Sequence, residues 1–266
     1  RELVPCVHLE RVFRQAAESL IVTNAHAIVK GEMPELSCRT GDFFFLENED
    51  ALAQQRLVVD LVSRRLPKSY GYDPLRDIQV ITPAKQGPLG TRELNRCLQY
   101  KLNPPACGKG EATLMGRTLR EGDKVMQIRN NYDIVWQQPD GTAGAGIFNG
   151  DMGIIEMLDN GSKTILVRFE DKLATYSFEN QDQLEHAYAV TVHKSQGSEF
   201  EAVVMPLERR HPKLHYRNLL YTAVTRARRL LIMTGQKETV YAMVQNNRRT
   251  LRYTNQKEML REMYNE

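Results

Sequence analysis

The sequence predicts an α/β fold in which a parallel sheet flanked by helices is interrupted by a small β-barrel. Two observations lead to this prediction. Near both ends of the chain, segments with helical spacing of apolar residues alternate with short apolar runs, as in strand–helix–strand units. Between them, residues 116–178 hold several short strands of alternating polarity, separated by the turn signals Asn149-Gly150 and Asn160-Gly161. A run of this kind indicates a barrel inserted into the α/β domain.

The elements before the barrel follow from apolar spacing and from helix stop signals. A helix is expected over 19–30, because apolar residues at helical spacing precede Gly31, a natural C-terminal stop. A second helix is expected over 50–66, with Pro67 as its end. Short apolar runs predict strands at 4–9, 42–46 and 78–81. The last strand leads into a glycine-rich turn and a helix, an arrangement that presents backbone N–H groups to anions.

The barrel and the last part of the chain are predicted in the same way. Barrel strands are expected at 123–128, 151–157, 163–169 and 173–178, with a loop at 139–146. After the barrel, a dense polar cluster spans 191–199. The stretch that follows is expected to be a helix carrying Arg226, Arg228 and Arg229, and it runs into a buried strand at 230–233. A further strand is expected at 202–205, a helix at 238–244, and a polar tail at the end.

Composition narrows the class of protein only moderately. The 266 residues carry a net charge of +3, which permits a nucleic-acid partner without demanding one. The four cysteines form no CxxC pair, so no zinc site is expected and the thiols are expected to be reduced, as in a cytoplasmic protein. No apolar run approaches the roughly 18 to 20 residues that span a membrane. Since the chain starts at Arg1 inside a plausible strand, we expect it to be a piece of a longer polypeptide.

Two stretches of the last part resemble motifs of a known family. AYAVTVHKSQGSEF (187–200) and NLLYTAVTRARRLLI (218–232) resemble motifs V and VI of superfamily 1 DNA helicases. The likeness is greatest to the RecD-like branch of superfamily 1B, which includes RecD, TraA and the exodeoxyribonuclease V alpha subunit. The resemblance implies a RecA-like domain, called 2A, at 1–115 and 180–250. It also implies an SH3-like barrel, called 2B, at 116–179, and leaves 251–266 as the tail.

The resemblance also implies roles for particular residues. Arg14, in the segment VFRQA, and Arg226 match the two arginines that reach the γ-phosphate of ATP. The remaining expected ATP contacts are Gln15, Gly197 and Glu199. The single-stranded DNA contacts implied by motif V, by the turn after the strand at 78–81 and by the barrel are Thr191, His193, Lys194, Thr82, Lys85, Gln86, Asn130 and Asn149. Arg129, Asn131, Tyr132 and Trp136 are further barrel candidates, although a lone aromatic in a barrel is more often a packing residue.

The function implied is that of the second motor domain of an ATP-dependent DNA helicase that moves 5′ to 3′ and acts in DNA repair and recombination. The sequence holds neither a Walker A loop nor a convincing Walker B strand. We therefore expect the Mg²⁺ ligands in a missing N-terminal RecA-like domain, and no ATP hydrolysis by this chain alone. Expected partners are single-stranded DNA, that missing domain and subunits of a nuclease complex, with no membrane.

Two alternatives remain open at the level of sequence. The chain is either part of a motor or a non-enzymatic nucleic-acid-binding module that has kept a motor-like shape. Arg14, Glu199 and Arg226 favour the motor, because a pure binding module has no use for γ-phosphate arginines. A third possibility, the helicase part of a conjugative relaxase, requires a tyrosine-and-histidine relaxase domain upstream.

Overall fold

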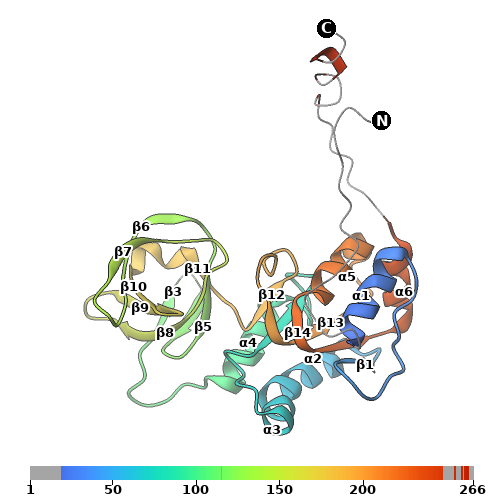
Figure 1. Ribbon diagram of the computed structural model, residues 1–266. Helices are drawn as coiled ribbons and strands as arrows, with labels where there is room; N and C mark the ends of the chain where they lie inside the picture. Colours follow the sequence, from blue (N-terminus) through green and yellow to red (C-terminus); the bar gives the residue numbers. More distant parts are fainter. Residues whose placement is uncertain (1–18, 115, 248–254, 256–258, 260, 264–266) are drawn as a thin grey trace.

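A computed structural model describes residues 19–114, 116–247, 255, 259 and 261–263. Figure 1 shows two bodies side by side, an α/β body and a β-barrel. The predicted strand at 4–9 and the candidates Arg14 and Gln15 lie outside the described residues, as does most of the predicted tail. Among the described residues, no helix is long and apolar enough to cross a bilayer.

The α/β body is built on a five-stranded sheet in the order β1-β14-β13-β2-β12. All four neighbouring pairs are parallel. The strands are β1 (Phe43–Glu47), β2 (Ile78–Thr82), β12 (Ala189–Thr191), β13 (Phe200–Pro206) and β14 (Ala227–Gly235). The residues of β2 are all buried, as expected for a parallel strand that is covered on both faces. The predicted α/β class with a RecA-like parallel sheet is confirmed.

Helices cover both faces of this sheet, and alternating strand residues define two cores. Leu231 and Met233 pack on one face with α1 (Leu20–Lys30), α5 (Arg217–Val224) and α6 (Lys237–Gln245). Leu230 and Ile232 pack on the other face with α2 (Ala51–Asp60) and α4 (Thr91–Leu102). Since successive strand residues point to opposite faces, one apolar strand supplies both cores.

Two predicted helix ends are wrong. The helix that begins at Ala51 does not end at Pro67. It passes through a π-helical segment, Leu61–Arg65, into α3 (Leu66–Tyr70) and ends at Gly71, whose φ is 73°. Pro67 lies in the first turn of α3, where a missing N–H is tolerated. The later helix α5 ends at Val224, so Arg226 follows it and the two other arginines lie on β14.

The barrel is inserted between α4 and β12 and contains a seven-stranded antiparallel sheet in the order β11-β5-β8-β9-β10-β6-β7. Its strands are β5 (Lys124–Gln127), β6 (Asn131–Gln137), β7 (Ala143–Ile147), β8 (Met152–Asp159), β9 (Thr164–Phe169), β10 (Lys172–Ser177) and β11 (Leu184–His186). A hairpin of β3 (Glu111–Leu114) and β4 (Arg117–Arg120) precedes it, and 3-10 turns lie at Phe178–Gln183 and Pro212–Leu214. The four predicted barrel strands are present as β5, β8, β9 and β10.

The loop predicted at 139–146 is in part a strand. β7 pairs with β6, and Gly144 lies opposite Trp136. A Cβ at Gly144 would lie 2.5 Å from the Trp136 ring, so only glycine allows the ring to cover this strand. The Lys172 ammonium lies 4.9 Å from the centroid of the same ring. The Trp136 side chain therefore packs within the barrel.

Candidate nucleotide and nucleic-acid sites

The predicted site residues of the α/β body lie at two opposite edges of the sheet. Thr191 pairs with Thr82 where β12 and β2 end. Phe200 pairs with Ala227 where β13 and β14 begin. The connection 192–199 therefore leads from the carboxyl edge of the sheet to its amino edge. It carries a predicted DNA contact, Lys194, near its start and the predicted ATP contacts at its end.

A groove lies at the carboxyl edge, between α4, the end of β12 and the barrel. Its volume is ≈ 990 Å³. It brings together four predicted DNA contacts from two segments of the chain, namely Lys85, Gln86, Thr191 and Lys194. The barrel side is formed by residues that include Arg117, Thr118, Met126 and Glu185.

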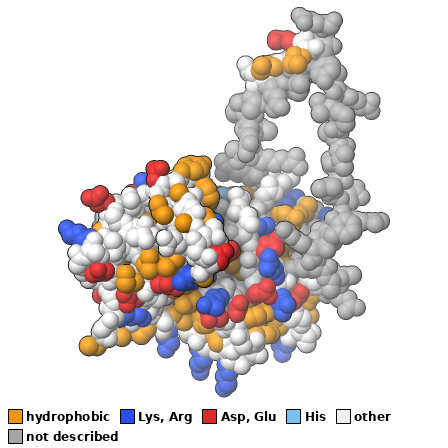
Figure 2. Space-filling model, turned by 60° about the vertical axis from the view of Figure 1, so that its left-hand side comes forward, with side chains coloured by type: hydrophobic (Ala, Val, Ile, Leu, Met, Phe, Trp, Pro, Cys, Tyr) orange, Lys and Arg blue, Asp and Glu red, His pale blue; other side chains and the backbone are white. Residues whose placement is uncertain are grey.

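Basic residues outnumber acidic residues in the lining of this groove. The basic lining residues are Lys85, Arg92, Arg96, Arg117 and Lys194, and the acidic ones are Glu93 and Glu185. Arg96 pairs with Glu93 at 2.5 Å, and Lys194 pairs with Glu185 at 2.6 Å. Neither Lys85 nor Arg92 forms a salt bridge with a carboxylate of the described residues. Figure 2 shows basic and acidic side chains interspersed over the face of the molecule that it presents.

The other predicted DNA contacts lie apart from the groove lining. The Thr82 side chain is buried, and its hydroxyl donates to the carbonyl of Leu89 at 2.7 Å. It therefore stabilises the turn between β2 and α4 and does not face the groove. His193 is exposed, and its Nε2 lies 3.3 Å from the hydroxyl of Tyr216. On the barrel, the backbone N–H of Asn149 donates to Asn130 Oδ1 at 3.0 Å, which joins two exposed loops.

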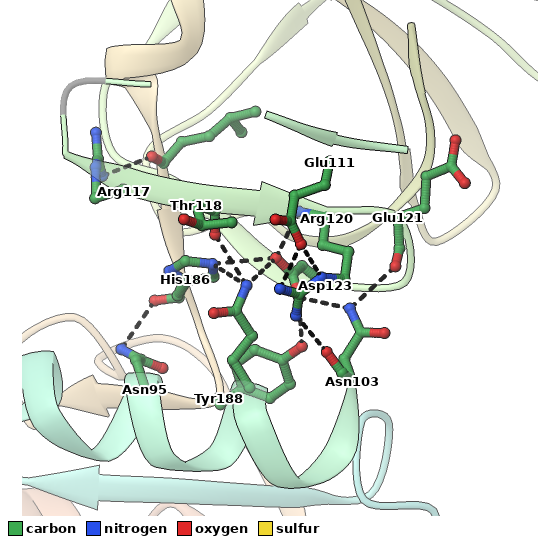
Figure 3. A network of polar contacts seen from close by, with 12 residues as sticks. Asn95, Asn103, Glu111, Arg117, Thr118, Arg120, Glu121, Asp123, His186 and Tyr188 are labelled. Carbon is green, nitrogen blue, oxygen red and sulfur yellow. Dashed lines mark hydrogen bonds and ion pairs between the residues drawn. The ribbon is translucent and has the colours of Figure 1, made fainter. Parts of the chain in front are cut away.

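A buried carboxylate, Asp123, connects the barrel to the α/β body (Figure 3). Its Oδ1 accepts from Asn103 at 2.6 Å and from the hydroxyl of Tyr188 at 2.8 Å. Its Oδ2 accepts from Gln99 at 2.7 Å and from the backbone of Arg120 at 2.8 Å, and lies 3.1 Å from His186 Nε2. The donors come from α4 and the residue after it, from the end of β4 and from the segment that returns to β12. This network fixes the orientation of the two groove walls.

The ionisation of Asp123 follows from the same contacts. Burial opposes the charge, but the hydrogen bonds from His186, Asn103 and Tyr188 outweigh it and lower the pKa of the Asp123 carboxyl. A buried carboxylate that accepts several hydrogen bonds stays ionised at neutral pH. The junction between the two bodies is therefore stabilised by hydrogen bonds to an ionised carboxylate, that of Asp123.

Lys124, the next residue, is buried at the same junction. Its ammonium donates to the carbonyl of Ile78 at 3.3 Å, which joins the start of β5 to the start of β2. Burial lowers the pKa of Lys124 to about 8, although Asp73 and Asp77 act in the opposite direction. The junction thus holds a buried cation beside a buried anion.

Arg226 lies at the amino edge of the sheet. Its guanidinium donates to the carbonyls of Thr222 and Ser198, each at 3.0 Å, and to the hydroxyl of Thr225 at 3.1 Å. A guanidinium carries five N–H donors, so these described partners leave two for an incoming group. The bond to Ser198 places the arginine against the end of the 192–199 connection.

Gly197 and Glu199 flank that contact. Gly197 has φ 89°, and apart from its two chain neighbours no described residue lies within 4 Å of a Cβ built on it, so its backbone is open to approach. Glu199 pairs with Arg228 at 3.2 Å, and Glu201 pairs with Arg229 at 3.0 Å. Arg228 and Arg229 thus pair with acidic residues nearby, and Arg226 is directed differently from both.

Sequence reasoning missed several residues of the junction and the groove. Arg117 and Glu185 line the groove from the barrel side, but no motif marks either of them. Asn95 donates to the carbonyl of Ala189 and accepts from its N–H, which holds the edge strand β12. Asp123 lies in the stretch GDKVMQI, where its burial and partners have no local signal. All four depend on contacts between segments far apart in the chain.

Two family descriptions match the chain. Residues 94–169 match the SH3 domain of ATP-dependent RecD-like DNA helicases. Residues 186–234 match the UvrD-like helicase C-terminal domain, which spans the candidate residues from Thr191 to Arg226. The chain is therefore a relative of the superfamily 1 helicases.

The branch is the RecD-like one. The ATP-dependent RecD2 DNA helicase of Deinococcus radiodurans is 32% identical over 227 residues, which cover 85% of this chain and 28% of that protein. The RecBCD enzyme subunit RecD of Mycolicibacterium smegmatis is 25% identical over 205 residues, which cover 74% of this chain and 33% of that protein. The chain thus spans about a third or less of these two relatives.

Among solved structures, the chain is similar to the Pif1 helicase from Bacteroides in complex with ADP-AlF3 and ssDNA. The sequence identity is 16% and the TM-score is 0.49, with 97% of this chain and 56% of that chain covered.

Proposed function

We propose that this chain is the second motor domain of an ATP-dependent RecD-like DNA helicase that moves 5′ to 3′. In this role it supplies Arg226 to the γ-phosphate of ATP and binds single-stranded DNA along the groove at the carboxyl edge of the sheet. We also propose that Arg14 and Gln15 complete the nucleotide contacts and that the domain limits are 1–115, 116–179 and 180–250.

One observation carries the proposal. The connection 192–199 joins the groove, where Lys194 lies, to the amino edge, where the carbonyl of Ser198 accepts from Arg226. A motor must convert a change at the nucleotide into a change at the nucleic acid. A single short segment with one end at each site provides a direct route for that conversion, because a shift at one end moves the other.

The side chains at the amino edge fit one side of a triphosphate. Arg226 offers two guanidinium donors, the Gly197 backbone is open, and Glu199 provides a carboxylate for a ribose hydroxyl. Phosphoryl transfer depends on positioned positive charge, and an arginine finger contributes roughly 10³ to 10⁵ in rate. Among the described residues, no cluster of acidic and histidine side chains suits a metal ion. We therefore propose that Mg²⁺ is held by the N-terminal RecA-like domain.

The groove suits a sequence-independent contact to a phosphate backbone. Lys85, Arg92 and Lys194 present cationic groups, whereas no Phe, Tyr or Trp is among the described residues that line it. Phosphate contacts of this kind fix the position of a strand without reading its bases. Because counterions are released on binding, affinity should fall with salt by a slope of roughly 0.7 per phosphate on a single strand.

The test is a measurement of DNA-stimulated ATPase activity in the full natural polypeptide that contains this chain. Single-stranded DNA should stimulate the wild type, and Arg226→Ala should reduce the rate by about three orders of magnitude. Arg229→Ala is the matched control, because it removes a nearby arginine that pairs with Glu201 and should leave the rate within about twofold.

Two results would contradict the proposal. The first is an inactive full polypeptide that still binds DNA, which would make the chain a non-enzymatic nucleic-acid-binding module. The second is ATPase activity in the 266-residue chain alone that Arg226→Ala abolishes.

A further inference from the structure

One acidic side chain from the barrel lies among the cations of the groove. Glu185 is on β11, opposite Met126 of β5, and both residues line the groove. Its Oε2 lies 2.6 Å from the ammonium of Lys194, which belongs to the turn after β12 in the other body. The pair therefore spans the groove from one wall to the other.

The surroundings of Glu185 are those of an anion site. Burial opposes its charge, but the hydrogen bond and charge of Lys194, together with the charges of Arg117 and Lys85, lower the pKa of the carboxyl. Three cations from three segments of the chain thus act on a single carboxylate. The other acidic lining residue, Glu93, is paired with Arg96 on its own helix and spans nothing.

The pair is also accessible. The side chains of Lys194 and Glu185 retain 25% and 43% of their exposure, so water and salt reach both. A carboxylate and a phosphodiester are both anionic acceptors, and an ammonium binds either at the same short distance. An entering strand can therefore exchange with the carboxylate without opening the core of either body.

We propose that Glu185 occupies the place of one backbone phosphate and that single-stranded DNA must displace it from Lys194. This inference rests on the proposed binding of DNA in the groove. It gives the barrel a second role besides forming one wall of the groove, since a barrel carboxylate competes with DNA for Lys194. With no strand bound, the carboxylate keeps Lys194 oriented and the groove partly neutralised. A strand gains the lysine only by breaking the contact between the barrel and the motif V turn.

The structure offers a matched pair of variants. Glu185→Gln removes the competing charge and keeps the shape of the side chain. Glu156→Gln makes the same change in net charge, but Glu156 pairs with Arg168 between β8 and β9 of the barrel, and neither residue lines the groove. Any general effect of charge on DNA affinity appears in both variants, whereas release of Lys194 appears only in the first.

The experiment measures binding of a fluorescent oligo(dT) strand to the 266-residue chain by anisotropy across a salt series. Glu185→Gln should bind about fivefold more tightly at low salt, with a steeper salt slope, because added salt weakens the competing Glu185–Lys194 pair in the wild type only. Glu156→Gln should keep the wild-type slope. Glu185→Asp, which keeps the charge on a shorter side chain, should fall between the wild type and Glu185→Gln.

A double-mutant cycle gives a second, independent readout. Lys194→Gln should weaken binding more in the Glu185→Gln background than in the wild type, because only there is the lysine fully available to the strand. Additive effects, or a gain for Glu185→Gln no larger than that for Glu156→Gln, would overturn the inference and leave the proposed function intact. If the wild type fails to bind the strand at any salt concentration, the result contradicts the proposed function and therefore also the inference that rests on it.

Discussion

The hydroxyl of Tyr188 donates a 2.8 Å hydrogen bond to Oδ1 of Asp123, and this contact joins the α/β body to the barrel. Asn103, where the chain leaves α4, donates to the same oxygen atom. The outgoing and the returning segments therefore meet at a single buried carboxylate. Since the two groove walls belong to different bodies, their relative position depends on this junction.

Asp123→Asn should destabilise the protein. It replaces one carboxylate oxygen, which accepts hydrogen bonds, with an amide nitrogen, which can only donate and would face the same donor groups. We expect the free energy of unfolding to fall by about 2–4 kcal/mol, measured by urea denaturation. Asp133→Asn is the control, since Asp133 is exposed on the barrel surface and its substitution should stay within about 0.5 kcal/mol. Equal stability of the two variants would show that the network contributes little.

The contribution of Asp123 should also depend on pH. Its folded pKa is lowered from the ordinary value of 3.8, so the unfolded chain binds more protons in acid. The stabilisation is therefore complete above about pH 4 and is lost as the pH falls through the lower folded pKa. The stability gap between the wild type and Asp123→Asn should narrow in that acidic window. A gap that stays constant as the solution is acidified would contradict the assigned ionisation.

Lys124→Met should stabilise the protein at neutral pH. Burial lowers the pKa of Lys124 from 10.5 to about 8, so the buried ammonium costs free energy that an apolar side chain avoids. The expected gain is about 1–3 kcal/mol, because the bond to the Ile78 carbonyl is lost at the same time.

The sign of the pH dependence provides the check on Lys124. From about pH 8 to 10.5 the folded lysine releases its proton before the unfolded one, so the wild type gains stability as the pH rises. The advantage of Lys124→Met, followed by urea denaturation, should therefore shrink across this window. An advantage that grows with pH would show that the ammonium is not buried at a cost.

Lys85→Ala should reduce the salt dependence of DNA binding. Lys85 lines the groove, so its removal should lower the salt slope for oligo(dT) by about 0.7. Lys68→Ala, on α3 and outside the groove lining, makes the same change in charge and should leave the slope unaltered. A common effect of the two substitutions would indicate that only the total charge matters.

Gly197→Ala should lower stability through the backbone alone. At φ 89° an L side chain is strained, while open space around the Cβ removes any steric contact. We expect a loss of about 1–2 kcal/mol in the free energy of unfolding. Gly197→Asn should lose less, because asparagine tolerates this region better. Thermal denaturation of both variants tests the order, and the reverse order would rule out a backbone origin.

Much of the fold follows from the sequence because its signals are local. The first helix, α1, is capped at its start by Ser19, whose side chain accepts from the N–H of Val22, and at its end by Gly31 with φ 84°, as spacing and stop signals predicted. The strand β7 could not be predicted from its own residues, since Ala143-Gly-Ala-Gly lacks apolar alternation. Its structure comes from pairing with β6 and from the ring of Trp136.

The candidate sites show the same distinction between residues with a local sequence signal and residues that depend on long-range contacts. The resemblance to motifs V and VI implied Lys194, Gly197, Glu199 and Arg226, all of which lie in or beside one short connection. The side chains that join the two bodies have no such signal. The partners of Asp123 reach as far as Tyr188, 65 positions along the chain, so their assembly depends on the folded arrangement. For the same reason a carboxylate such as Glu185 is not visible as a groove residue until the barrel is placed beside the sheet.

The insertion of the barrel also determines when the sheet can form. Gln79 of β2 donates to the carbonyl of Tyr188, a residue 109 positions later, and the two sheet neighbours of β2 are β12 and β13. Contacts so distant in sequence close slowly, because the entropy of the intervening chain must first be overcome. A folded barrel shortens that loop by bringing its two ends together beside Asp123. Because β12 and β13 follow the barrel in the chain, β2 cannot pair with either neighbour during synthesis until the barrel has been made.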